Sequence, residues 1–153
     1  MIPPAVLLDL DDYRYAQPGP RQGLFVGVTR HLPRGVRRED YAKRNYFDVW
    51  LPLLAPSREL LAAYTQRQIT FRQFAVKYRA EMRQPGPRQA IRLLAATAQK
   101  YPVRVGCFCA DATHCHRTLL KGLIEASASD LPPSTEPSDK FASPACSMPE
   151  IED

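Results

Sequence analysis

Three of the four cysteines of this chain and two of its three histidines lie in one stretch, residues 103–120. Thiolates act as nucleophiles, redox groups and metal ligands, and histidine carries protons near neutral pH. A Cys-His-Arg run within the stretch adds a guanidinium, whose planar fork fits a phosphate or a carboxylate. Most of the residues that could do chemistry are therefore close together in the sequence.

The elements around these residues predict how they are placed. Residues 103–109 alternate in polarity, which indicates a strand with Cys107 and Cys109 on the same face. After a short polar break, aliphatic residues recur at helical spacing, and Thr113 is the expected N-cap. Cys115 would then lie in the first helical turn, where the helix dipole favours both a thiolate and a bound anion. Ligands of open α/β sheets bind at such carboxyl ends of strands.

The rest of the chain predicts the elements that support this stretch. Apolar runs at residues 5–10 and 23–29 indicate two more strands, each followed by Pro/Gly turn signals. Four helices are expected, at 38–54 with Pro52 as a kink or end, from Pro56-Ser57 through Tyr64, after the capping box Thr70-x-x-Gln73, and over 88–100 behind Pro87. A helix that leads into the strand at 103–109 is an α/β unit. We expect a single compact α/β domain with a small parallel or mixed sheet flanked by helices.

Length and charge divide the chain into two parts. A chain of 153 residues, 44% hydrophobic, is enough for one domain, which we place at residues 1–126. The net charge of +5 combines +10 in that domain with −5 in residues 127–153. This Pro/Ser-rich acidic tail has few large apolar side chains, so we expect it to be disordered. The basic domain favours an anionic partner, for which the tail would compete, whereas the alternative role of the charge is solubility alone.

Localisation is also predicted from the sequence. No apolar run is long enough to cross a membrane, and residues 1–8 have neither a basic leader nor a cleavage site after a long apolar segment. Three crowded cysteines are not typical of a secreted disulfide framework. We therefore expect a cytoplasmic protein without a membrane partner. No motif indicates a particular cofactor or oligomeric state.

Three segments resemble the domain-of-unknown-function 488 (DUF488) family in order and spacing. They are residues 25–36, 48–57 and 105–120, and the resemblance extends over roughly residues 5–126. Its most specific features are Cys109, the run Cys115-His116-Arg117 and the Arg-x-x-Pro-Arg-Gly turn at residues 30–35. The chain departs from the family pattern at Pro52, which interrupts a helix, and at Cys107, a thiol that the family commonly lacks. The resemblance implies a compact α/β fold with a pocket lined by these segments and no established activity.

The first functional hypothesis is a pocket that binds or acts on an anionic, phosphate-bearing ligand, either a nucleotide or nucleic acid. Cys109 or Cys115 would be a thiolate nucleophile, and His116 or His31 would carry the proton. The anion would be held by Arg30, Arg34 and Arg117. The alternative for these arginines is a solvated basic face, so an enzyme and a binding protein both fit the pattern.

The second hypothesis is a metal site. If Cys107 and Cys109 share a strand face, their sulfur atoms are ~7 Å apart, which is wide for a tetrahedral zinc with bonds of about 2.3 Å. Cys109, Cys115 and His116 with one outside ligand form an easier set. No Cys-x-x-Cys pair accompanies them, which argues against a closed structural zinc site, so the main expectation is no metal.

Two further hypotheses use the same residues differently. Cys109 and Cys115 could form a reversible disulfide across the loop. A noncatalytic basic interaction module would instead use the cysteines as small core residues, Cys107 most of all. Nearby aromatic residues could stack on a base, although their helical spacing favours the core; they are Tyr46, Phe47 and Trp50.

Overall fold

The computed structural model describes residues 8–19, 22–109 and 111–131. Four strands form one sheet in the order β1-β4-β2-β3, and every neighbouring pair is parallel. The strands are β1 (Leu10–Arg14), β2 (Leu24–Gly27), β3 (Val49–Trp50) and β4 (Val103–Cys107). This architecture confirms the predicted α/β fold, with the strand of the cysteine stretch inside the sheet.

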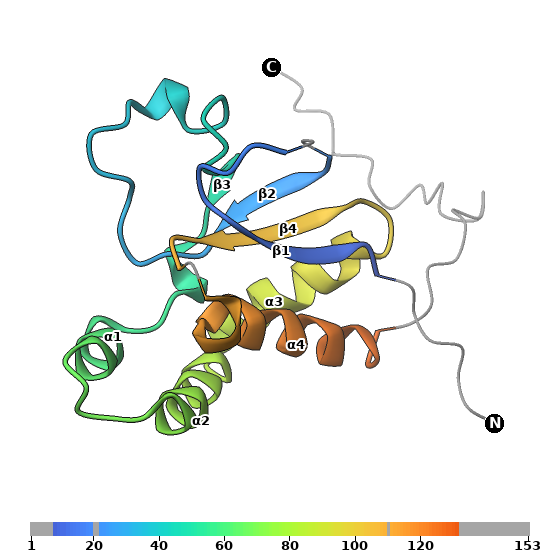
Figure 1. The fold of residues 1–153 in the computed structure, drawn as a ribbon. Helices are drawn as coiled ribbons and strands as arrows, with labels where there is room; N and C mark the ends of the chain where they lie inside the picture. The colour runs from blue at the N-terminus through green and yellow to red at the C-terminus, as the bar shows by residue number, and fades with distance from the viewer. Residues whose placement is uncertain (1–7, 20–21, 110, 132–153) are drawn as a thin grey trace, which may run out of the picture.

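Helices cover one face of the sheet (Figure 1). α3 (Pro85–Ala98) and α4 (His116–Ala128) run along it, and α2 (Phe71–Met82) packs against both, with α1 (Arg58–Thr65) beside α2. The core between the two layers contains aliphatic side chains from the inner strands and these helices, among them Val26, Val105, Leu94 and Ile124. Because alternate strand residues point to the same face, the alternation along β4 supplies this core.

Aromatic rings pack on the opposite face of the sheet. Tyr13 meets Phe25 edge-on with ring centroids 4.9 Å apart, and Tyr15 meets Phe108 in the same way at 4.7 Å. A Cβ atom at Gly106 would overlap the Tyr13 ring. This close approach of a ring to the backbone explains the glycine within β4, because any side chain there would displace the ring.

The starts of α1 and α2 follow the predicted signals. The Ser57 hydroxyl accepts the Leu60 N–H at 3.2 Å and caps α1, and the complete capping box is present at α2. α3 begins at Pro85, two residues before the expected Pro87. Proline fits there because the first helical turn does not need its missing N–H.

We expect Thr70→Ala to lower the free energy of unfolding by about 1 kcal/mol. The Thr70 hydroxyl accepts the Gln73 N–H at 3.2 Å, while the Gln73 side chain accepts the Thr70 N–H at 2.9 Å. Alanine leaves the Gln73 N–H without this acceptor. Urea unfolding measures the loss, with Thr65→Ala as the control, since that hydroxyl only donates to carbonyls at the exposed end of α1. Equal losses in the two variants would contradict the capping role.

The prediction of a helix over residues 38–54 is wrong. The structure has 3-10 helices at Arg38–Asp40 and Pro52–Leu54, with β3 between them. β3 pairs with β2, and the Trp50 indole N–H donates to the Thr29 carbonyl at 2.8 Å. These tertiary contacts outweigh the helical spacing of the apolar residues, and a proline in the helix interior would remove a backbone donor.

Other boundaries also differ from the prediction. β1 begins at Leu10, where the strand expected at residues 5–10 ends, and residues 1–7 lie outside the described part of the chain. α4 continues to Ala128, past the expected domain end at 126, and residues 132–153 of the predicted tail lie outside the described residues. Among the residues that the structure describes, no helix is long and apolar enough to cross a membrane.

Candidate functional site

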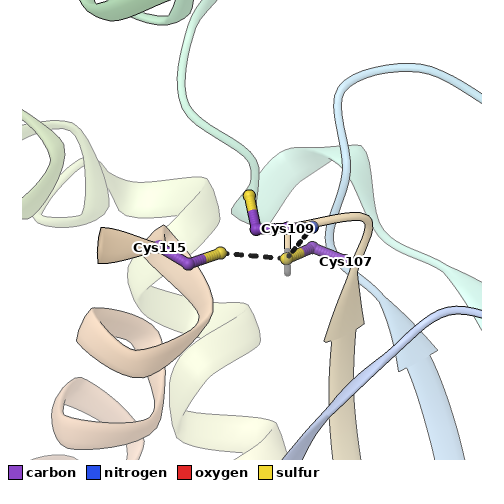
Figure 2. Close-up of side chains that lie close together, drawn as sticks. All are labelled: Cys107, Cys109 and Cys115. Carbon is purple, nitrogen blue, oxygen red and sulfur yellow. Dashed lines mark hydrogen bonds between the residues drawn. The ribbon is translucent and has the colours of Figure 1, made fainter. Parts of the chain in front are cut away.

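Three thiols gather at the carboxyl end of β4 (Figure 2). Cys107 ends the strand, Cys109 follows in the loop, and Cys115 lies directly before α4. We call these three residues the thiol cluster. The sulfur atoms of Cys107 and Cys115 face each other at 2.9 Å, and all three sulfur atoms lie within 4.8 Å of one another.

The predicted separation of ~7 Å between the Cys107 and Cys109 sulfur atoms is therefore wrong. The strand ends at Cys107, and the chain turns so that the Cys109 N–H donates to the Cys107 sulfur at 3.4 Å. Exposure then separates the thiols: Cys107 and Cys115 are 1% and 2% exposed, whereas Cys109 is exposed. Of the three, Cys109 alone offers its sulfur to a ligand without rearrangement.

The start of α4 also differs from the expectation. The helix begins at His116 with Cys115 as its N-cap residue, whereas Thr113 belongs to the 3-10 helix Ala112–His114. The Asp111 carboxylate accepts the Thr113 N–H at 2.9 Å and holds it in that turn. Cys115 thus precedes the first helical turn instead of lying in it, and it remains at the positive end of the helix dipole.

The electrostatics of the thiol cluster favour one thiolate. Hydrogen bonds from the Cys107 and Cys115 thiols, aided by the charge of Arg117, lower the pKa of Cys109 to about 2, although burial opposes this. The hydrogen bond with Cys109, together with burial, raises the pKa of Cys107, and hydrogen bonds with both other cysteines, together with burial, raise the pKa of Cys115. The negative charge therefore rests on the most exposed sulfur, where two thiol donors stabilise it.

His116 is held in one tautomer. Its Nε2 lies 2.7 Å from the Val28 carbonyl oxygen, and a nitrogen in that position must carry the proton that it donates. Burial lowers the pKa of His116, which keeps the ring neutral at pH 7. The lone pair is then on Nδ1, which lies 3.8 Å from the Cys115 sulfur. This nitrogen is available as a proton acceptor or a metal ligand.

Arg117 is buried, with 4% of its surface exposed. Its Nε donates to the Asp12 carboxylate at 3.0 Å, and one terminal nitrogen donates to the Cys109 carbonyl at 2.8 Å and to the Cys107 sulfur at 3.4 Å. Burial alone would lower the pKa of Arg117, but its interactions with Cys107, Cys115 and Asp12 outweigh burial and raise that pKa. The guanidinium therefore positions the cysteine loop, and its predicted contact with a bound anion stays a prediction.

A cavity of about 210 Å³ opens beside the thiol cluster. Its lining contains Thr29, Arg30, His31, Pro56, Leu61, Cys107, Phe108, Cys109 and His116. The Arg30 guanidinium donates to the carbonyls of Pro56 at 3.1 Å and Ala55 at 3.2 Å, which ties the cavity wall to the start of α1. Of the predicted site residues, Arg30, His31, Cys109 and His116 thus meet at one cavity. Arg34 is exposed in its turn and does not line it.

A larger cavity of about 590 Å³ lies along the connection between β2 and β3. Its wall includes Tyr41, Trp50 and Arg38, and it begins at Leu32, the residue after His31. Phe47 also borders it but is 4% exposed and belongs to the core, so the predicted aromatic residues divide between core and cavity. Adjacent residues of one loop therefore line both cavities.

Two features of the site were missed by the sequence reasoning. Asp12 pairs with Arg117 from a position 105 residues earlier, and no local pattern indicates such a contact. The sequence also predicted that the sulfur of Cys107 is too far from that of Cys109 to share a metal ion, whereas the turn after β4 brings both into the thiol cluster. Within the described part of the chain, the thiol cluster is the group close enough to hold a metal ion. It shares two residues with the predicted set of Cys109, Cys115 and His116.

Comparisons with known proteins agree with the extent of this fold. The family model described as the active DUF488-N3 subclade matches residues 10–128. The matched range begins at the first residue of β1 and ends at the last residue of α4, so it contains the whole sheet and all four α-helices. A search of curated proteins found no match, and neither did a search of solved structures.

Proposed function

This chain belongs to the DUF488 family, and from its site we propose that the cavity beside the thiol cluster binds an anionic, phosphate-bearing ligand, either a nucleotide or nucleic acid. A cysteine thiolate in the cavity wall takes part, as a nucleophile or as a metal ligand. The observation that carries the proposal is that the exposed thiol of Cys109 lines the same cavity as Arg30 and His31.

The charge of the surrounding chain supports an anion. Residues 28–44, which follow β2 and form part of the wall of the larger cavity, contain six lysine and arginine residues against two acidic residues. Arg30 lies in the cavity wall, and Arg34 and Arg38 are exposed farther along the same connection. A basic segment beside a concave site raises the local concentration of anionic ligands.

The sizes of the two cavities support a nucleotide in particular. A volume of about 210 Å³ is below the range of about 300–1,000 Å³ typical of sites for whole small molecules, so it suits a phosphate group and part of a sugar. The base would lie in the cavity of about 590 Å³, against the partly exposed Trp50, whose indole is fixed by Thr29. Stacking on such a ring tolerates any base.

In this proposal the polar residues have distinct roles. Cys109 meets the ligand, and Arg30 neutralises its phosphate. His31, exposed at the cavity, transfers the proton, while the buried His116 keeps its Nδ1 3.8 Å from the Cys115 sulfur. Arg117 acts indirectly, because it holds the loop that presents Cys109.

Thermal unfolding of the full chain tests the proposal. Inorganic phosphate, pyrophosphate and a nucleoside monophosphate, compared at equal ionic strength, are expected to raise Tm by several degrees near saturation, because a ligand that binds only the folded state stabilises it. Arg30→Gln should abolish most of this shift. Arg92→Gln, on the exposed side of α3, serves as the matched control and should keep it.

Two results would contradict the proposed anion site. If no phosphate compound raises Tm at any concentration below those that act by ionic strength alone, the chain has no such site. If the shift is the same in Arg30→Gln and Arg92→Gln, the anion binds elsewhere on the basic surface.

A further inference from the structure

We propose that Cys107, Cys109, Cys115 and the Nδ1 of His116 form a binding site for a thiophilic divalent metal ion such as Zn²⁺. The inference deepens the proposed function, since it gives the thiolates of that cavity a role as metal ligands. Only one part of the inference rests on the proposed function, namely that an anionic ligand binds next to the metal. The metal site itself rests on the geometry and charge of its own four residues.

The positions of the sulfur atoms fit a tetrahedral ion. Zinc–sulfur bonds of about 2.3 Å place two sulfur ligands of one ion about 3.8 Å apart. The three sulfur atoms of the thiol cluster lie within 4.8 Å of one another, and those of Cys107 and Cys115 are 2.9 Å apart. The required separation lies between these two values, so small side-chain rotations can bring all three atoms around one ion.

His116 is the fourth ligand of this site. Its ring nitrogens are not within 4.8 Å of all three sulfur atoms, so a side-chain rotation has to bring Nδ1 to the ion. Its Nδ1 is 3.8 Å from the Cys115 sulfur, whereas zinc bonds of about 2.3 Å to sulfur and about 2.0 Å to nitrogen give about 3.5 Å between the two atoms. Its Nε2 donates to the Val28 carbonyl at 2.7 Å. Histidine ligands of metals are oriented by such a bond from the other ring nitrogen. The bond fixes the tautomer that a metal at Nδ1 needs.

The surrounding charges also suit a metal bound by thiolates. Three thiolates and one divalent ion leave a net charge of about −1, which costs free energy in a buried place unless it is balanced. The Arg117 guanidinium lies 3.4 Å from the Cys107 sulfur and is 4% exposed. Its contact with the Asp12 carboxylate holds it there. The fold therefore provides a fixed cation beside the cluster.

The location connects the metal to the cavity. Cys107, Cys109 and His116 line the cavity of about 210 Å³, so an ion bound between them lies in its wall. A metal there would add positive charge next to Arg30 and favour the phosphate of a bound ligand. It would also fix the loop from Cys107 to Cys115, in which Cys109 is the exposed cysteine.

Metal content and cobalt spectroscopy on the full chain test this inference. Protein purified under reducing conditions without chelator is expected to contain about one zinc ion per chain, as measured by elemental mass spectrometry. After removal of the metal, Co²⁺ should give the spectrum of a tetrahedral thiolate site. Cys109→Ser should weaken Co²⁺ binding more than about 100-fold, beyond the 10–100-fold typical of residues that only support ligands.

Controls separate ligand loss from misfolding. Cys109 is exposed, so its serine variant is expected to fold, which the Tm of the metal-free protein checks. Cys146→Ser removes the fourth cysteine, outside the proposed site, and should leave the cobalt spectrum and affinity unchanged. His116→Gln should weaken binding and shift the visible bands, because nitrogen is replaced among the ligands.

Absence of metal from the purified chain together with no cobalt spectrum would overturn the site, as would equal losses in Cys109→Ser and Cys146→Ser. The phosphate-induced rise in Tm is measured separately on metal-free protein. If that rise persists while no metal binds, the metal site fails and the anion site stands. If metal binds with the expected variant pattern but no phosphate compound changes Tm, the anion site fails and the metal site stands.

Discussion

Arg117→Ala is expected to lower the free energy of unfolding by about 3 kcal/mol, measured by urea unfolding. Removing one partner of a buried ion pair typically costs about 3–5 kcal/mol, because the other partner keeps an unpaired charge away from water. Arg117 is buried, but the side chain of Asp12 is 21% exposed, so we expect the lower end of this range. The variant also leaves the Cys109 carbonyl without its donor at 2.8 Å.

A second arginine pair on the same sheet is the matched control. Arg104 donates to Asp9 at 2.8 Å, a shorter distance than in the pair of Arg117 and Asp12, but these side chains are 22% and 57% exposed. Exposed pairs contribute about 0–1 kcal/mol, so Arg104→Ala should have a small effect. Similar losses in the two variants would mean that Arg117 does not act as a buried charge. Arg117→Lys should recover only part of the loss, because an ammonium group cannot make all three contacts.

Local patterns predicted α1 to α4 and the strand β4, because these elements depend on local interactions. The side chains of Val103, Val105 and Cys107 lie on the same, buried face of the strand, as expected. The capping box at Thr70 works through residues three apart in the chain, so the sequence alone specifies it. Where an element depends on its neighbours in the sequence, reading the sequence was sufficient.

The segment between β2 and α1 shows where such reading fails. Its apolar residues are spaced as in a helix, yet Trp50 lies in β3 and Phe47 packs among the aromatic rings of the sheet. The decisive interactions are the pairing with β2 and the contact of the Trp50 indole with Thr29. Both join segments about 20 residues apart, which periodicity does not detect.

The candidate site divides in the same way. The Cys-His-Arg run and the cysteine at the end of the strand could be identified from the sequence alone. The fold brings Cys109 and His116 to one cavity. The partners that orient them were not visible. His116 depends on a carbonyl of Val28, and Arg117 depends on Asp12, at separations of 88 and 105 residues. The types of chemical group were predictable, but their tautomer, burial and charge partners required the tertiary structure.

Gly106→Ala should destabilise the fold by about 3 kcal/mol, the upper end of the range typical of overpacking. The new methyl group would overlap the Tyr13 ring. That ring cannot move aside easily, because its hydroxyl donates to the Tyr46 carbonyl and its edge packs on Phe25. Urea unfolding measures the loss, and Tyr13→Ala in the same chain should recover part of it if the clash is the cause.

The same substitution of glycine by alanine at Gly122 is expected to change the free energy of unfolding in the opposite direction. Gly122 is exposed within α4, and a Cβ atom there meets nothing within 4 Å. Alanine in an exposed helix position is about 1 kcal/mol more favourable than glycine, so this variant should be more stable than the wild type. If both alanine variants were stabilised, the Tyr13 ring would not lie against the backbone of β4. Gly106, the residue before Cys107, would then have space for a side chain. The end of β4 would be less tightly packed and would hold the thiol cluster less rigidly.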